Sequence, residues 1–117
     1  MLGDISVARE IYLACGYTDM RKSIDGLAAV VRDQLKLDPY SSSLFLFCGK
    51  RRDSLKALLW EPTGFLLLYK RLEAGSFRWP MDKTSARQLS KKQLEWLLDG
   101  LAIDQPKAIR EIEPCDF

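Results

Sequence analysis

Three apolar runs of strand length, separated by turn-forming residues, constrain the fold of this chain more than any other feature. The runs cover residues 44–48, 55–60 and 65–69, and they are rich in residue types that favour strands. Pro62 and Gly64 fit a type I turn in a four-residue hairpin loop between the second and third runs. We therefore predict an antiparallel meander.

A helix is expected before the meander. Apolar residues recur at helical spacing from Met20 to Leu35, and Thr18 and Asp19 supply N-cap chemistry just before them. The helix should therefore begin near Met20 and end before Pro39. A short apolar run at residues 10–15 is predicted to form a strand upstream of it.

A second helix is expected after residue 90. Ser90 and Gln93 have the spacing of a capping box, and Gly100 is placed to end the helix. The chain between Tyr69 and Ser90 is expected to be irregular, and residues 108–112 could add an edge strand within an irregular acidic tail, 103–117. The prediction is one α+β domain over residues 1–117, with an antiparallel meander sheet packed against two helices.

Composition excludes several classes of protein. The 117 residues contain no apolar run of about 18 residues, and residues 1–14 lack the pattern of a secretion signal, so we expect a cytoplasmic protein with no membrane partner. The chain has no histidine, which excludes Ser/His/Asp and Cys/His catalysis. Its three cysteines form no ligand motif, so we expect reduced structural thiols, no metal and no cofactor.

Charge is distributed unevenly along the chain. The net charge is +2, but residues 1–49 carry a net −1, residues 50–92 a net +7 and residues 93–117 a net −4. A basic centre followed by an acidic tail suggests either a negatively charged partner or an internal contact between the tail and the centre. Both remain open from the sequence.

The predicted meander brings basic residues from separate segments together. Successive strands reverse direction, so the first connection and the exit of the third strand should lie at the same end of the sheet. Cations gathered there would repel each other unless phosphates or carboxylates neutralise them. We predict a phosphate-binding surface, the alternative being that the loop charges stay solvated; its residues are Lys50, Arg51, Arg52, Lys70 and Arg71, with Lys56 nearby.

A second anion site is predicted at the start of the first helix. Arg21 and Lys22 would occupy its opening turn, where the helix dipole disfavours cations, and such a violation can mark a functional site. With Thr18 and the free N–H groups of that turn, they could hold an anion. The alternative is that Asp19 and Asp25 offset them on the surface.

Aromatic residues interleave with the basic ones, a composition that supports base stacking beside phosphate contacts. Residues 77–80 lie in a segment expected to be irregular, so Arg78 and Trp79 are predicted to be exposed and to contact DNA or protein. The alternative is that the aromatic side chains belong to the core. A nuclease would need clustered acids around divalent cations, and the sequence shows no motif for one.

These motifs and their order along the chain resemble those of an accessory-protein family, called TnpB, which is encoded by the second reading frame of insertion sequence 66 elements. The resemblance covers the chain to about Gly100. It rests on residues 18–28, the 51–56 segment, Trp60 with Gly64 and Phe65, the 69–75 segment, and Phe77, Trp79 and Pro80. It implies participation in transposition beside a separate transposase that cleaves and transfers the strands.

The expected function is therefore a non-catalytic accessory role in DNA transposition. The partners expected are DNA at the element ends, bound through phosphates, and the element-encoded transposase. An adaptor without direct DNA contact, using residues 77–80 and the sheet edge, is the first alternative. A metal-dependent nuclease is the second.

Overall fold

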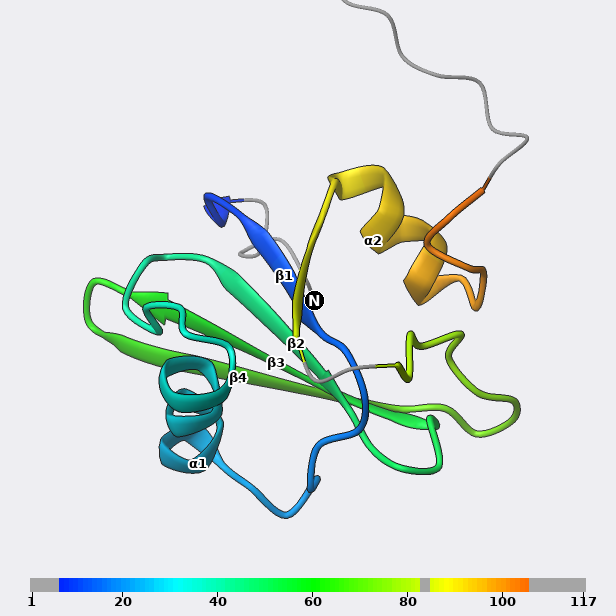
Figure 1. Cartoon of the computed structure of the whole chain (residues 1–117), viewed down its shortest axis with the longest axis horizontal. Helices are drawn as coiled ribbons and strands as arrows, with labels where there is room; N and C mark the ends of the chain where they lie inside the picture. The colour runs from blue at the N-terminus through cyan, green and yellow to red at the C-terminus, as the bar shows by residue number, and fades with distance from the viewer. Residues whose placement is uncertain (1–6, 83–84, 106–117) are drawn as a thin grey trace, which may run out of the picture.

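A five-stranded mixed sheet is the centre of the computed structural model, which describes residues 7–82 and 85–105 (Figure 1). The strand order is β4-β3-β2-β1-β5. The α+β class is confirmed, but the purely antiparallel sheet is wrong, because β1 runs parallel to β2. The strands are β1 Ile11–Ala14, β2 Leu44–Cys48, β3 Ser54–Glu61, β4 Gly64–Arg71 and β5 Ala86–Leu89.

The predicted meander is confirmed in β2, β3 and β4. Each strand is antiparallel to the next, and the β3–β4 ladder runs without interruption from Ser54 opposite Arg71 to Glu61 opposite Gly64. The turn between them is Pro62 and Thr63, inside the loop predicted from the sequence. All five residues of β2 are buried, as expected for a strand covered on both faces.

The first helix begins four residues later than predicted. It comprises α1, Ile24–Ala29, and continues directly into η2, Val30–Gln34, a π-helical segment in which Leu35 N–H donates to the Val30 carbonyl at 3.0 Å. The late start has a local cause: the Asp19 carboxylate accepts the Arg21 backbone N–H at 2.9 Å, so it closes a turn instead of capping a helix.

Strand β5 contradicts the expectation of an irregular chain up to Ser90. Residues 86–89 pair antiparallel with β1, from Ala86 opposite Ala14 to Leu89 opposite Ile11. The pairing satisfies one edge of β1, whose other edge is occupied by β2. A partner so distant in sequence explains why local composition did not reveal the strand.

The second helix, α2 Lys91–Leu98, has the predicted capping box. Ser90 Oγ accepts the Gln93 N–H at 3.1 Å, and Gln93 Oε1 accepts the Ser90 N–H at 2.9 Å. Gly100 follows at φ +81°, a left-handed conformation that suits glycine after a helix. The edge strand predicted at 108–112 and most of the acidic tail lie outside the described residues.

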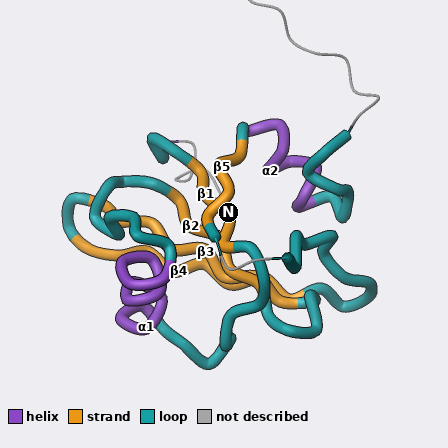
Figure 2. The backbone as a smooth tube through the Cα atoms, in the orientation of Figure 1, coloured by secondary structure: helices purple, strands orange, loops and turns teal. Residues whose placement is uncertain are grey.

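Each face of the sheet carries its own hydrophobic core. The two helices α1 and α2 lie well apart from each other (Figure 2). Leu27 and Val31 of the first helical segment pack on the face that presents Phe45 and Phe47. Leu94 and Leu97 of α2 pack on the face that presents Leu44 and Leu46. Within the described ranges, no helix has the length and apolarity needed to cross a membrane.

Candidate nucleic-acid interface

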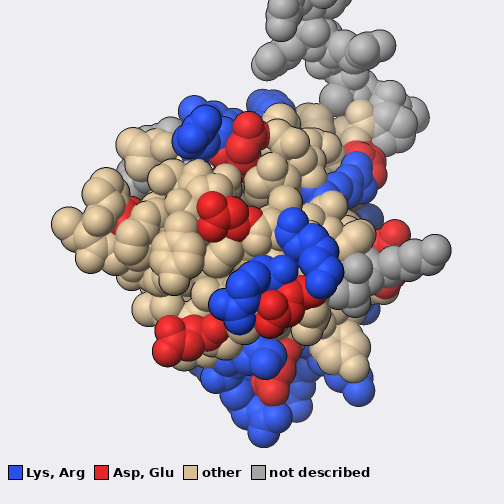
Figure 3. Space-filling model, turned by 60° about the vertical axis from the view of Figure 1, so that its left-hand side comes forward, with Lys and Arg blue, Asp and Glu red and all other residues tan. Residues whose placement is uncertain are grey.

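The β2–β3 connection and the exit of β4 lie at one end of the sheet, as predicted. Arg71 and Lys70 pair with Ser54 and Leu55, the first residues of β3, and Leu72 N–H donates to the Asp53 carbonyl at 2.7 Å. Lys and Arg side chains gather at the lower end of the space-filling view, with acidic side chains among them (Figure 3). We call this the basic end, defined by residues 49–53, 70 and 71.

The backbone of the β2–β3 connection divides its cations between two grooves. Arg52 has φ +62°, its N–H donates to the Gly49 carbonyl at 2.9 Å, and its own carbonyl accepts the Phe77 N–H at 2.6 Å. This left-handed residue reverses the chain. Lys50 and Arg51 therefore line one groove, whereas Arg52 lines another.

The first groove combines three exposed cations with an exposed aromatic ring. Lys50 Nζ lies 5.9 Å from the centroid of the Tyr17 ring, which is 60% exposed. Sequence reasoning missed Tyr17, although its place beside Gly16 and Thr18 was a signal of an exposed loop. The groove has a volume of about 510 Å³ and is lined by Tyr17, Thr18, Asp19, Met20, Gly49, Lys50, Arg51, Asp53, Ser54 and Arg71.

The carboxylates at the first groove leave part of its positive charge uncompensated. Asp19 is engaged by Arg21, and Arg71 makes a looser contact with Glu73 at 3.9 Å in which both side chains are well exposed. Across residues 7–82 and 85–105, no carboxylate lies within 4.0 Å of the side-chain nitrogens of Lys50 or Arg51. These two cations are available to an anionic partner.

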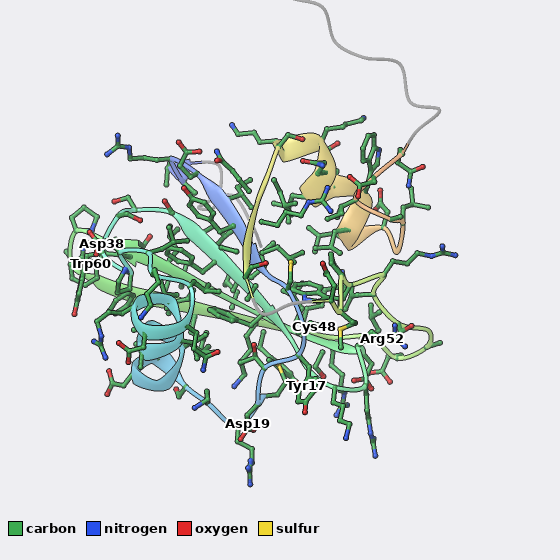
Figure 4. The ribbon with its side chains drawn as sticks, in the orientation of Figure 1. Tyr17, Asp19, Asp38, Cys48, Arg52 and Trp60 are labelled. Atoms are coloured by element: carbon green, nitrogen blue, oxygen red, sulfur yellow. The ribbon has the colours of Figure 1, made fainter. Side chains whose placement is uncertain are left out.

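The residues of the predicted second anion site do not lie at the start of the helix. Arg21 and Lys22 precede α1, so they do not lie in its first turn. Arg21 Nη2 instead contacts Asp19 Oδ2 at 2.8 Å, in agreement with the alternative in which Asp19 offsets the cation. Figure 4 labels Asp19 in the loop that leads into α1. The hydrogen bonds from Arg21 lower the pKa of Asp19 to about 2, so this pair stays charged at neutral pH. Thr18 joins the first groove.

Lys56 is held in place by two neighbours on the α1 face of the sheet. Its Nζ donates to the Lys22 carbonyl at 2.8 Å and lies 5.8 Å from the centroid of the Tyr69 ring. The Tyr69 hydroxyl in turn lies 3.3 Å from Ser54 Oγ. Lys56 therefore links β3, β4 and the segment before α1, and it is less free to reach a ligand than Lys50 or Arg51.

Lys70 projects from the opposite face to Arg71. Its β3 partner, Leu55, belongs to the core under α2, and cross-strand partners share a face. Successive residues of β4 alternate, so Arg71 points to the α1 side. The backbones of the five cations predicted to share one surface therefore lie close together, but their side chains point in different directions. Three of them line the first groove, Arg52 lines the second, and Lys70 lines neither.

The prediction that residues 77–80 form an exposed contact is wrong for both aromatic residues. Phe77 and Trp79 are 1% and 4% exposed, and Trp79 Nε1 donates to the Ala14 carbonyl at 2.9 Å. Alternation places Arg78 outward, where it lines a second groove of about 530 Å³ with Arg52 and Arg87. Arg87 in that groove forms an ion pair with Asp104.

Two further observations concern catalysis. Cys15 and Cys48 are free and buried, as expected of structural thiols, and burial raises the pKa of Cys48 to about 12; Cys115 lies outside the described residues. In the part of the chain that the structure describes, no three His, Cys, Asp or Glu side chains gather as a metal-ligand set.

The fold and the basic end together define a small α+β protein with a cationic groove beside the edge of a mixed sheet. A family model described as IS66 Orf2-like protein matches residues 9–108, and the chain belongs to this family. It is therefore a member of the accessory-protein family encoded by the second reading frame of IS66 insertion sequences. The resemblance noted in the sequence is confirmed.

Two proteins from Sinorhizobium fredii are similar in sequence to this chain. The uncharacterized protein y4hO is 37% identical over 97 residues, which cover 83% of this chain and 84% of the relative. The uncharacterized protein y4jC is 36% identical over 91 residues, covering 78% of each chain. No solved structure matches the chain.

Proposed function

We propose that the protein is a non-catalytic accessory protein that binds the phosphate backbone of DNA at the ends of its insertion sequence and assists a separate transposase. The observation that carries the proposal is the first groove, in which Lys50, Arg51 and Arg71 lie together with exposed Tyr17. Membership of the IS66 Orf2-like family supports the transposition context.

The chemistry of the groove suits a nucleic-acid backbone. Lys and Arg contribute most of the affinity for phosphates by releasing counterions, and an aromatic ring beside them offers a stacking surface for a base. The groove is open and its cations are on flexible, exposed side chains, so it would position DNA without reading its sequence. Cleavage and strand transfer are assigned to the transposase in this proposal.

Salt-dependent DNA titration tests the proposal. Terminal-repeat DNA and random DNA of equal length are titrated with the full chain at two salt concentrations, with and without the transposase. About three phosphate contacts would give a log–log slope near −2.7, which corresponds to a roughly 40-fold loss of affinity for a fourfold rise in salt. Both DNA sequences should bind the isolated chain similarly.

Single substitutions assign the binding to the groove. Lys50→Ala, Arg51→Ala and Arg71→Ala should each weaken binding and reduce the salt slope by about 1. Lys91→Ala is the matched control, because Lys91 is an exposed cation at the start of α2 outside both grooves. Equal losses in the control and the groove variants would contradict the proposal.

Two other outcomes would replace the proposal. Binding that requires the transposase and survives added salt would identify an adaptor. DNA cleavage by the purified chain in the presence of magnesium would identify a metal-dependent nuclease.

A further inference from the structure

Strand β4 presents an unpaired outer edge eight residues long. It is the terminal strand of the sheet in the described part of the chain, with β3 on its inner side. The hydrogen bond from Leu72 N–H to the Asp53 carbonyl fixes which residues face β3. In an antiparallel ladder this alternation makes residues 64, 66, 68 and 70 face inward, so the backbone groups of Phe65, Leu67, Tyr69 and Arg71 face outward.

This edge lacks two of the features by which proteins usually protect an exposed strand, a bulge and a proline, and its charged residues, Lys70 and Arg71, lie only at its C-terminal end. The β3–β4 register has no bulge, and no proline lies within Gly64–Arg71. Leu66 and Leu68 are only partly buried on one face, as are Phe65 and Leu67 on the other. By contrast, the other edge strand, β5, has only four residues. A long apolar edge with free backbone groups is a template for another strand.

We propose that β4 pairs antiparallel with β4 of a second copy of this chain, joining two sheets into one. A two-fold axis perpendicular to the sheet keeps each face on its own side, so only residues of the same parity can lie opposite one another. With the axis between the two Leu67 residues, Phe65 lies opposite Tyr69 of the second copy. The outward backbone groups of Phe65, Leu67 and Tyr69 in both strands are then satisfied.

Charge complementarity selects this register. Lys70 of one copy comes opposite Gly64 of the other, and beyond Gly64 lies its β3 partner, Glu61. Glu61 and Lys70 share the α2 face, and a Cβ placed on Gly64 would have nothing within 4 Å. Lys70 can therefore extend over Gly64 toward Glu61 of the second copy, across two strand spacings, or about 10 Å between Cα atoms.

Within residues 7–82 and 85–105, Glu61 and Lys70 have no charged partner in the same copy. The two-fold axis would form the Lys70–Glu61 pair twice. An axis at Leu68 would instead place Lys70 opposite Leu66, so it would lose the pair.

Sedimentation of the full chain without DNA, over a range of protein concentrations, measures its oligomeric state and so tests the proposal. Glu61→Lys and Lys70→Glu should each weaken the dimer roughly five- to tenfold, because each introduces like charges at two symmetric contacts. The Glu61→Lys, Lys70→Glu double variant should restore wild-type association. Glu95→Lys, at an exposed position of α2, is the matched control and should leave the dimer unchanged.

A backbone substitution tests the strand pairing itself. Leu67→Pro removes an outward N–H, so it should abolish the dimer while circular dichroism shows that the sheet remains; if that variant does not fold, Leu67→Lys at the same axis replaces it. A wild-type chain that stays monomeric at every concentration would overturn the proposal. A dimer that ignores both charge reversals, or that they weaken without mutual rescue, would overturn it as well. DNA binding enters none of these readouts, so the proposed function is tested separately.

Discussion

The indole N–H of Trp79 donates a hydrogen bond to the backbone carbonyl of Ala14 over 2.9 Å, and both residues are buried. This contact ties the segment before β5 to the end of β1. It gives Trp79 a structural role in place of the exposed, base-stacking role that its basic neighbours suggested.

Removing this hydrogen bond should destabilise the fold. Trp79→Phe keeps most of the apolar area but leaves the Ala14 carbonyl without its donor, at a cost of about 1–3 kcal/mol. Urea denaturation should show a lower midpoint with an unchanged slope. Arg78→Ala, next to it and exposed, is the control and should change stability by less than about 0.5 kcal/mol. Equal effects of the two would contradict the assignment.

Gly49 leaves room for Met20. A Cβ at Gly49 would lie 2.7 Å from Met20 Cγ, closer than two carbons can approach, so the methionine must move. Gly49→Ala should cost about 1–3 kcal/mol by overpacking. Met20→Ala removes the clashing atoms, so the double variant should be more stable than the sum of the two single effects implies. Thermal unfolding of the four proteins measures this coupling, and strict additivity would exclude a direct clash.

The capping box should be worth a measurable part of the stability of α2. Ser90→Ala removes the acceptor for the Gln93 N–H, and such replacements cost about 0.5–2 kcal/mol. Ser90→Asp preserves an acceptor at this position and should retain most of the stability. Chemical denaturation measures the free energy of unfolding of the two variants. Only the alanine variant should be less stable than the wild type, which distinguishes the loss of the N-cap from a general effect of substitution.

The Asp19–Arg21 pair should contribute to pH dependence in acid. The pKa of Asp19 falls from 3.8 to about 2 in the folded chain, chiefly through the Arg21 side-chain hydrogen bond. Because the folded pKa is depressed, the stabilisation is present above pH 3.8 and is lost as pH falls toward about 2. A carboxyl NMR titration should show the low pKa, and Arg21→Ala should raise it. An unchanged titration in that variant would remove Arg21 as the cause.

Local patterns predicted the elements that depend on neighbours in sequence. The meander follows from apolar runs and the turn at Pro62, and α2 follows from the Ser90 and Gln93 capping pattern. Strand β5 could not be predicted in this way, because its order comes from pairing with β1, more than seventy residues earlier. The parallel orientation of β1 to β2 likewise depends on how the chain crosses between them.

The sequence predicted which backbone segments meet at the candidate site, but it did not predict where their side chains point. Because strand direction alternates in a meander, Arg71 and Lys50 lie at the same end of the sheet. The direction of each side chain depends on further details, such as the left-handed conformation of Arg52 and the strand register that turns Lys70 to the other face. Tyr17 and the pairing of Arg21 with Asp19 depend on loop geometry. No spacing rule in the sequence describes that geometry.

The pairing of β1 with β5 also has a consequence for synthesis on the ribosome. Ile11 is made well before its antiparallel partner Leu89, which lies more than seventy residues later in the chain. Until then one side of β1 stays open, and closing so long a loop is slow compared with forming the local hairpin of β3 and β4. The nascent polypeptide should therefore complete its sheet late, with the hairpin formed first.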